Sequence, residues 1–585
     1  MENTDEICLQ RGIAKYLNKN AIWEVLSRCK LQVLPLFHFI ASFFYSSRRF
    51  IHDDTFMERI FRVTLDDSIS SFMEHILCVF ITRIFAAVLI FASWNLLFYV
   101  VKHICTKSWV KIACFTFVVG AGIVLLRLPE SFGYEIDNYI TYAYTVRYFP
   151  YYWHHVFTGC FYGGCLIWFP QQFSIGIVQW ALFCITFFFF YNFLQESNRV
   201  NKSVIKFSFA VFLVPDVYRI ILNPYRNCIY AIVSAFFFFL IFEFLSKKRT
   251  AVIKALPVLS VGILVALWRS EGILLGVIGF GAFCLFSAMR RAQKITLFAV
   301  FLGLTCIFSL PQRIGNKKYY RSDYSIINTI PSLQLILRYA SNLDYAGAEE
   351  DLATIDRLFS LDVINQHGLA GYWARNLKVT GNNTQTNLTE SEIKAYMKAY
   401  HSLVLHNLKS FLKTQISLMT RAIGKPKTFA VPAYTGSDRK IELNFGVMWE
   451  TGIHDYYTGL VERWKNCVLR QKLNSKINTF CTVYNTHLAN FHAVVRLRIL
   501  LILSLCAISV YEVVVFFLRK DDFSPELLFA PLIWLLELFM IFLFMPDGRT
   551  QYLFPFFLNA FFISFYFLSL FEYKLEIKRK YTPVA

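Results

Sequence analysis

Residues 228–246 read CIYAIVSAFFFFLIFEFLS, with Glu243 as the one charged side chain in the stretch. A helix of about 20 mostly apolar residues crosses the ~30 Å hydrocarbon core of a bilayer, so this stretch predicts a transmembrane helix. Lys247, Lys248 and Arg249 follow it directly. Clusters of Lys and Arg are typical of short cytoplasmic loops. The stretch therefore predicts both a membrane span and its direction.

The rest of the chain has the same character. Of its 585 residues, 56% are hydrophobic, 18% are aromatic and 17% are charged. These fractions leave too little polar surface to cover a water-soluble globule of this size. The formal net charge of +20 needs no nucleic-acid partner, because cytoplasmic loops of membrane proteins collect Lys and Arg. We expect an all-α polytopic membrane protein whose partner is membrane lipid, with no nucleic acid.

Apolar runs of about span length predict the number of crossings. They begin near residues 78, 111, 173, 206, 228, 251, 271, 295, 497, 526 and 551. The run Leu31–Tyr45 is shorter and holds Pro35 and His38, so it is either a twelfth span or an interfacial helix. This gives about 11–12 transmembrane helices. Phe-rich runs such as Phe187–Phe190 are explained by exposure to lipid.

Clusters of basic residues orient these spans. Six clusters should be cytoplasmic: Lys102, Lys107 and Lys111; Arg199, Lys202 and Lys206; Lys247, Lys248, Arg249 and Lys254; Arg290, Arg291 and Lys294; Arg519 and Lys520; Lys578, Arg579 and Lys580. Successive spans cross the bilayer in opposite directions. All six clusters can then be cytoplasmic only if Tyr151–Phe169 does not cross the bilayer. That stretch holds His154, His155 and several glycines and ends at Pro170, which favours a helix on the outer membrane surface.

This topology predicts four regions. Residues 1–77 form an N-terminal region with the uncertain first helix. Residues 78–312 form a transmembrane bundle that includes a first outer loop over 128–172. Residues 313–496 form a mainly helical extracytoplasmic domain, and residues 497–585 form three further transmembrane helices and a cytoplasmic tail.

Two carboxylates open the first outer loop directly after a span. Glu135 and Asp137 lie two residues apart and are followed by Tyr139. A carboxylate here could act as a general base on an acceptor hydroxyl, or bind a divalent metal such as Mg or Mn through hard oxygen ligands. The alternative is a solvated helix N-terminus, where acidic residues suit the helix dipole.

Arginines gather on the same predicted face of the membrane. Arg219, Arg226, Arg269 and Arg549 lie in outer turns. The planar guanidinium group makes two parallel bonds to phosphate, and a lipid-linked donor would present a phosphate at the membrane surface. The alternative is that some of them, such as Arg219 near Asp216, form local ion pairs at helix ends.

Other polar side chains on this face favour structural roles. His154 and His155 are adjacent, so they point in different directions on a helix and are poor partners for one metal; we expect interfacial anchoring, with one of them near the acceptor. Residues 394–413 predict an amphipathic helix resting on the bilayer or on the bundle, with His401 and His406 at its rim.

The plan resembles the GT-C class of integral membrane glycosyltransferases, which have many spans, an early acidic motif in the first large outer loop and surface helices after it. Glu135 and Asp137 occupy the place of that motif, and the stretch from His154 is similar to the surface-helix stretch. Two turns complete the resemblance. Residues 549–555, RTQYLFP, are similar to the late Arg-x-x-Tyr-x-x-Pro turn of the family. Residues 268–272, WRSEG, are similar to an Arg-containing outer turn of its bacterial members.

The resemblance implies an inverting transfer from a polyprenyl-phosphate-linked sugar donor to a glycan, lipid or protein acceptor. Asp137 or Glu135 would be the base, and the four arginines would hold the donor phosphate. The active site would lie on the extracytoplasmic face of a bacterial inner membrane, with the ER membrane as the alternative. Two other functions stay open: an O-antigen-type polymerase or ligase using Arg375, His401, His406 and Arg421, and a flippase of lipid-linked sugars.

Overall fold

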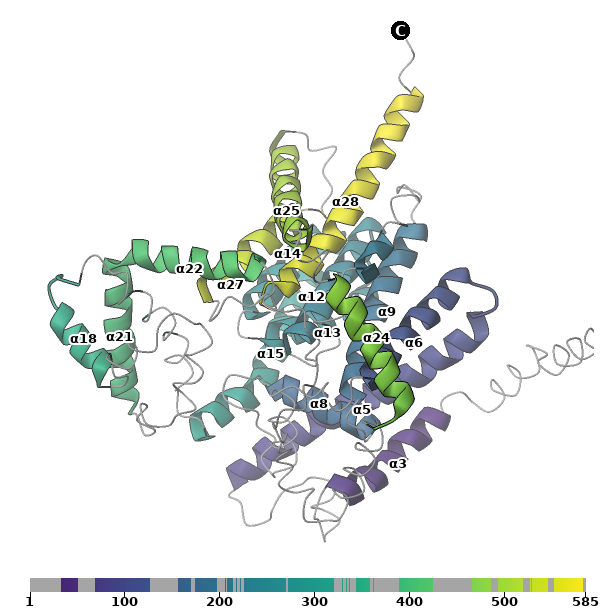
Figure 1. Cartoon of the computed structure of the whole chain (residues 1–585), viewed down its shortest axis with the longest axis horizontal. Helices are drawn as coiled ribbons and strands as arrows, with labels where there is room; N and C mark the ends of the chain where they lie inside the picture. Colours follow the sequence, from purple (N-terminus) through teal and green to yellow (C-terminus); the bar gives the residue numbers. More distant parts are fainter. Residues whose placement is uncertain are drawn as a thin grey trace, which may run out of the picture. The chain divides into compact units, whose positions relative to one another are not determined.

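The computed structural model describes most of the apolar segments (Figure 1). The described residues are 33–50, 69–126, 156–169, 174–196, 226–269, 272–319, 343–357, 389–424, 466–484, 493–518, 529–544 and 552–581, together with 206, 208–213, 217, 221, 329, 333, 336, 361 and 527. All regular elements in these ranges are helices, and six of them are long and apolar enough to cross a membrane. The described part of the chain is therefore all-α, and its six long apolar helices agree with the predicted polytopic membrane protein.

The six long apolar helices match six of the predicted spans. They cover Phe80–His103, Ser108–Leu125, Ser174–Glu196, Arg226–Ser246, Arg291–Leu310 and Val495–Leu518. Five shorter apolar helices lie at Val33–Phe43, Val252–Trp268, Gly272–Phe286, Pro531–Leu543 and Phe554–Leu570. The span predicted near residue 206 falls mostly outside the described residues, where only the 3-10 helix η1 (Ser208–Leu213) and isolated positions are described.

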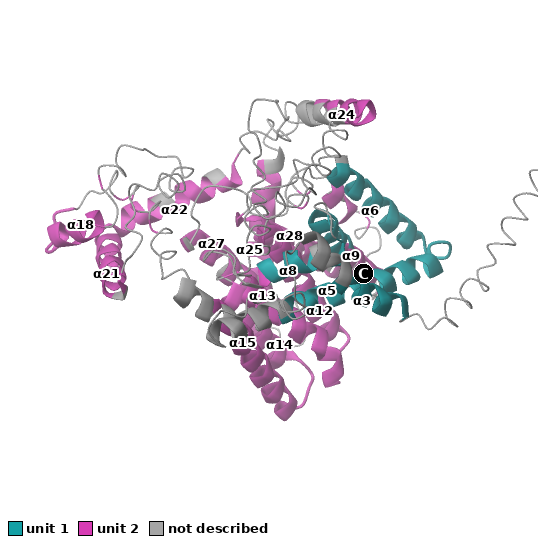
Figure 2. Ribbon diagram, turned by 90° about the horizontal axis from the view of Figure 1, so that it is seen from below, with its two compact units in different colours: residues 1–148, 159–184, 440–465 teal, residues 149–158, 185–439, 466–585 magenta. Residues whose placement is uncertain are grey.

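The chain divides into two compact units (Figure 2). Unit 1 comprises residues 1–148, 159–184 and 440–465, and unit 2 comprises residues 149–158, 185–439 and 466–585. Unit 1 contains α3 (Val33–Phe50), α5 (Ile69–His103), α6 (Ser108–Leu126), most of α8 (Val156–Trp168) and the first half of α9 (Ser174–Glu196).

Small residues let the helices of unit 1 approach closely. A Cβ atom on Gly164 of α8 would lie 2.7 Å from Cβ of Phe85 on α5, and one on Gly120 of α6 would overlap the ring of Trp180 on α9. Close backbone approach through small residues is typical of helix packing in membranes. The Trp180 indole also donates to the Thr116 carbonyl at 3.3 Å.

The packing of α8 defines how far it enters the membrane. Its 13 residues are about 20 Å long, too short for a hydrocarbon core of about 30 Å. Gly163 lies beside Thr82 near one end of the α5 span, whereas the Trp168 indole donates at 3.1 Å to Ser93 in the middle of that span. Gly176, near the start of α9, lies beside Val124, back at the end of α6 farthest from the α5–α6 turn. Along α5, the helix therefore reaches from one end of the apolar span to its middle.

This arrangement changes one expectation. The sequence favoured a surface helix within Tyr151–Phe169, but the described side chains from Phe157 to Cys165 are buried. Gly163 and Gly164, which suggested an irregular surface segment, instead let α8 pack closely against α5. His154 and His155 lie outside the described residues.

His38 of α3 completes the mid-depth end of α8. Its Nδ1 atom accepts from the Trp94 indole at 3.2 Å, and its Nε2 atom lies 3.1 Å from the Trp168 carbonyl. Because an indole nitrogen only donates, Nδ1 carries the lone pair and Nε2–H donates to the carbonyl. His38 thus satisfies a backbone group at the C-terminus of α8, inside a segment where unpaired backbone groups are expensive.

Unit 2 is a bundle built around α12 (Arg226–Ser246). In the apolar window of this helix, 78% of the residues are buried. Around it pack α13 (Leu256–Trp268), α14 (Gly272–Phe286), α15 (Arg291–Tyr319), α25 (Ala493–Leu518) and α28 (Phe554–Tyr581), together with a helix made of α26 (Phe529–Ile533), the π-helical segment η7 (Trp534–Leu538) and α27 (Phe539–Phe544). The short 3-10 helix η2 (Val252–Ala255) precedes α13. In the apolar windows of α15 and α25, only 17% and 22% of the residues are buried, so these two helices form the periphery of the bundle.

Aromatic rings fill much of this bundle. Phe187 and Phe190 of α9 contact Phe562 of α28 at ring-centroid distances of 6.5 and 4.8 Å, and Phe242 of α12 stacks on Tyr566 at 5.2 Å. Phe187, Phe188 and Phe190 are buried and only Phe189 is exposed. The expectation that lipid exposure explains this Phe run is therefore wrong for three of its four members, because Phe562 of α28 contacts Phe187 and Phe190, and Phe209 and Phe212 of η1 contact Phe187 and Phe188.

The two ends of the unit 2 bundle carry different polar groups. At the end we call the Lys247 end, Glu243 of α12 pairs with Lys247 and Arg249, each at 2.8 Å. Lys248 adopts a φ of 46°, and Arg249 N–H donates to the Phe244 carbonyl at 3.2 Å. A left-handed residue followed by this backbone bond ends the helix in a Schellman motif. Arg226 and Arg269 mark the opposite end, called the Arg269 end.

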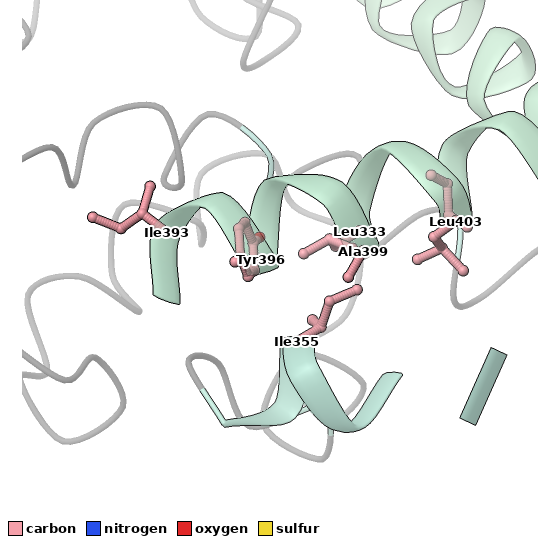
Figure 3. Close-up of a cluster of buried hydrophobic side chains, with 7 residues drawn as sticks. Leu333, Ile355, Ile393, Tyr396, Ala399 and Leu403 are labelled. Atoms are coloured by element: carbon pink, nitrogen blue, oxygen red, sulfur yellow. The ribbon is translucent and has the colours of Figure 1, made fainter. Parts of the chain in front are cut away.

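A small helical subdomain follows α15. It contains α18 (Ala348–Asp356) and α21 (Glu390–His406), which pack around a core of Leu333, Ile336, Ile355, Ile393, Tyr396, Ala399 and Leu403 (Figure 3). Thr389 begins α21 with a capping box, since its hydroxyl accepts from Glu392 N–H and the Glu392 carboxylate accepts from Thr389 N–H. Another helix, α24 (Val468–Tyr484), lies farther along the chain.

The amphipathic segment predicted over residues 394–413 is two helices. It divides at Asn407, between α21 and α22 (Leu408–Ile423). Asn407 ends α21 by donating its side-chain amide to the Leu403 carbonyl at 3.1 Å, and its backbone leaves the helical conformation. α21 packs into the subdomain core, whereas α22 contacts α25 and α27 of the bundle.

Candidate functional site

Arg269 is the predicted phosphate-binding residue that the structure describes most fully. It directly follows α13 and is only 8% exposed. Its guanidinium carbon lies 5.6 Å from the Tyr230 ring centroid and 6.0 Å from the Tyr552 ring centroid. A cation over aromatic faces is stabilised by the ring quadrupole. The arginine is thus held between α12 and the segment leading into α28.

Tight packing fixes the turn that carries Arg269. Gly272 N–H donates to the Arg269 carbonyl at 3.0 Å. A Cβ atom at Gly272 would overlap the Val265 carbonyl oxygen and lie 3.1 Å from the Tyr230 ring. Only glycine fits between these atoms, so the start of α14 stays pressed against α13 and the arginine keeps its place beside Tyr230.

The contact with Tyr552 joins two of the quoted turns. Arg269 and Tyr552 belong to turns that are far apart in sequence, and their contact brings the described parts of these turns together. Arg549 itself lies outside the described residues. Arg226 is half-buried and begins α12, one helical turn before Tyr230. We call Arg226, Tyr230, Arg269 and Tyr552 the Arg269 cluster.

Helix termini add to the positive character of this cluster. α12, α14 and α28 begin at Arg226, Gly272 and Phe554 respectively, all at the Arg269 end of unit 2. Each N-terminus carries about half a positive charge from the aligned peptide dipoles, which favours a bound anion. α13 also ends here, at Trp268, and its C-terminus carries the opposite partial charge, so the helix termini supply only part of the positive character and Arg226 and Arg269 supply the rest.

The other predicted site residues lie outside the described residues. These are Glu135, Asp137, Tyr139, His154, His155, Arg219 and Arg549. Their proposed roles stay predictions. Among the described residues no group of three or more His, Cys, Asp or Glu side chains is placed to hold a metal.

Of the residues for the polymerase alternative, His406 has a clear structural position. Its ring stacks on Tyr345 at a centroid distance of 3.9 Å, and its Nδ1 atom lies 2.8 Å from the Ser402 carbonyl. His401 is exposed and lies beside Tyr400, whereas Arg375 and the Arg421 side chain are not described. The two histidines lie on the subdomain helix α21, as rim residues would.

Unit 2 also contains a buried polar cluster that was not predicted from the sequence. Glu537 lies in the π-helical segment η7, and its Oε2 atom accepts from the Asn559 amide of α28 at 2.9 Å. The same amide donates to the Ser234 hydroxyl of α12 at 3.2 Å. All three side chains are at most 4% exposed. The available signal was a lone carboxylate in the middle of an apolar run, which by itself marks a functional candidate.

The Glu537 helix has an irregularity at the same place. Short π-helical segments inside α-helices often occur at functional sites. The carboxyl group lies in the middle of the apolar helix Pro531–Leu543 and contacts two other helices through Asn559. This cluster is separate from the Arg269 cluster, which lies at the end of the bundle.

Comparisons with known proteins add no assignment. No family model matches the chain, and no curated protein or solved structure matches it.

Proposed function

We propose that this protein is a membrane glycosyltransferase that moves a sugar from a lipid-phosphate-linked donor to an acceptor. The observation that carries the proposal is the Arg269 cluster, in which a buried arginine is held between Tyr230 and Tyr552 at the end of the bundle. A phosphate at a membrane surface would meet a cation there, and the apolar helices beside it suit a lipid tail. The resemblance to GT-C enzymes supports the same function.

In this reaction the carboxylate of Asp137 or Glu135 takes the proton of the acceptor hydroxyl. The hydroxyl oxygen attacks the anomeric carbon, and the bond from that carbon to the phosphate oxygen breaks in line with the attack. The lipid phosphate leaves with the electron pair, and Arg269 stabilises its charge. The proposed steps require positioning, one base and a cationic group, and none of them depends on a metal.

The proposal places the reaction at the Arg269 end of the bundle, on the extracytoplasmic face. The Lys247 end carries Lys247, Arg249, Arg290 and Lys294, as cytoplasmic ends do. A bacterial inner membrane is the proposed location, with the ER membrane as the alternative.

The test measures release of free polyprenyl phosphate from radiolabelled polyprenyl-phosphate sugars by purified protein with a host glycan or lipid extract. We expect Arg269→Ala to lower turnover by about 10²–10³-fold, the usual effect of removing a group that stabilises transition-state charge. Asp137→Asn or Glu135→Gln should abolish turnover and so identify the base. Arg290→Ala, at the exposed opposite end, is the matched control and should leave turnover unchanged.

Three results would contradict parts of this proposal. Full turnover by Arg269→Ala would remove the phosphate role of the cluster. Turnover that survives both carboxylate substitutions, but not His406→Ala, would favour the polymerase or ligase alternative. A folded protein that turns over no donor would contradict the transferase.

A flippase of lipid-linked sugars is the second candidate, and two observations favour it. Transporters use broken helices and charged groups near the bilayer midplane. Glu537 lies in a π-helical segment in the middle of its helix, and α8 ends beside the middle of the α5 span. Transport of the donor across liposomes, lost in Glu537→Ala and kept in Asp137→Asn, would support this function over the transferase.

A further inference from the structure

Two hydrogen-bonding residues hold α22 against the bundle of unit 2. Near its middle, the Gln415 side-chain amide donates to the Leu543 carbonyl of α27 at 3.3 Å. At its C-terminus, Nη1 of Arg498 on α25 donates to the carbonyls of Ala422, Ile423 and Gly424 at 3.4, 3.0 and 2.9 Å. Cations suit helix C-termini, where carbonyls lack helical partners.

These contacts fix the depth of α22. Leu543 is the last residue of one apolar segment, and Arg498 lies in the first turn of the span Val495–Leu518. Both contact points are therefore at the membrane boundary, at the end of the bundle where α27 finishes and α25 begins. Because the two points lie about two helical turns apart along α22, the helix runs across the direction of α25, as Figure 1 shows.

The side chains of α22 form three arcs around its axis. The arc packed against protein includes Asn407, Gln415, Leu418 and Ala422, which are buried. A second arc is apolar and exposed, with Leu408 at 48%, Leu412 at 38% and Ile416 at 57% exposure. The third arc is exposed and polar, and consists of Lys409, Lys413, Ser417 and Thr420. At 3.6 residues per turn, the apolar arc lies between the packed arc and the polar arc.

We propose that α22 is an interfacial helix whose apolar arc enters the lipid leaflet at the Arg269 end of the bundle. The packed arc then faces α25 and α27, the apolar arc faces acyl chains, and the polar arc faces headgroups and water. Lysines bordering an apolar stripe extend their ammonium groups to lipid phosphates. This inference is independent of the proposed enzyme activity.

The apolar arc continues a surface that already faces lipid. Ile499, Leu500 and Leu503 follow Arg498 on α25 and are 43%, 60% and 60% exposed. α22 ends at the level where α25 begins to present these side chains. Lipid thus meets α22 at the depth at which it meets α25, whereas a water-facing position would leave Leu408, Leu412 and Ile416 as an apolar stripe in solvent.

The test uses the full chain in vesicles of phosphatidylcholine and phosphatidylglycerol that contain a phosphatidylcholine with a photoreactive diazirine in its acyl chain. After illumination, mass spectrometry maps the labelled residues. We expect label on Leu412 and Ile416, as on Leu500 and Leu503, and none on Ser417 or Thr420. The double variant Leu412→Glu with Ile416→Glu should lose the α22 label and keep the α25 label.

The matched control is Ser417→Glu with Thr420→Glu, which adds the same charges to the polar arc and should keep the α22 label. Label on α25 without label on α22 in the wild-type protein would overturn the proposal. So would a disulfide formed between two copies of the Leu412→Cys variant, because the apolar arc would then be covered by protein. The α25 label reports that each variant is folded and inserted.

Discussion

Two buried charged side chains in unit 2 have different surroundings. Arg269 lies between two tyrosine rings at the end of the bundle, whereas Glu537 accepts from an amide in its interior. The sequence predicted an outer position for Arg269 from the turn that carries it. Its partners Tyr230 and Tyr552 belong to other turns of the chain, so only the fold could bring them together.

The Glu537 cluster leads to a prediction on stability. Asn559→Leu removes the amide that donates to Glu537 and Ser234, and losing a buried hydrogen bond to a charged group costs about 1.5–3 kcal/mol. Glu537→Gln keeps an acceptor for Asn559 and removes the charge, so it should cost less. Thermal unfolding in detergent compares the two. Asn95→Leu, at an exposed site on α5, is the control and should not lower the midpoint; equal midpoints for Asn559→Leu and Asn95→Leu would contradict the role of the cluster.

The exposed subdomain leads to a prediction on pH. Burial, and then the hydrogen bond to Asp351, raise the pKa of Tyr345 to about 12. Because the folded pKa lies above the ordinary value of 10.0, the phenol keeps its proton in the folded state. Its contribution to stability is present below pH 10 and is lost as the pH rises through about 12. The ultraviolet difference between wild type and Tyr345→Phe should titrate near 12; a transition near 10 would show that neither burial nor Asp351 raises the pKa of this hydroxyl.

At the scale of elements, α8 depends on a residue far from it in sequence. His38→Leu removes both the bond to the Trp168 carbonyl and the acceptor for the Trp94 indole. We expect faster hydrogen exchange in the last turn of α8 and a loss of about 1–3 kcal/mol in stability. His401→Leu, at an exposed site, should change neither. Unaltered exchange in α8 of the His38 variant would show that its end is held by other contacts.

Hydropathy predicted the long spans because length and composition alone decide whether a helix can cross a membrane. It did not predict which faces are buried. The sequence of Phe187–Phe190 indicates a lipid-facing run, but rings of η1 and α28 bury three of the four. Residues 394–413 have the pattern of one helix because Asn407 interrupts no apolar pattern. Such features depend on contacts between distant segments, which periodicity does not encode.

The whole molecule has a charge asymmetry that labelling can test. Lys247, Lys254 and Lys294 belong to the end that the positive-inside rule places in the cytoplasm, whereas Lys398 and Lys409 belong to α21 and α22. In intact cells, a membrane-impermeant amine reagent should modify Lys398 and Lys409. The first three lysines should react only after permeabilisation. The reverse pattern would invert the topology and move the Arg269 cluster to the cytoplasmic face.

The candidate site could be predicted only in part. The positions of Arg226 and Arg269 in turns between spans were enough to single them out, because spans that cross in alternate directions identify the outer turns. The predicted base and Arg549 lie outside the described residues, so the resemblance alone supports them. The Glu537 cluster could not be assembled from sequence, since its three members come from three helices that pack in an order the chain does not reveal.

The half-depth position of α8 has a consequence for biosynthesis. A segment this short has too little apolar length to be retained in the bilayer as an independent anchor. The α5 residues that it packs against, and His38 of α3 that bonds its C-terminus, are both synthesised earlier. We therefore expect α8 to enter the membrane only after its N-terminal neighbours have assembled, so that translation order, and not hydrophobicity, determines when this part of the protein matures.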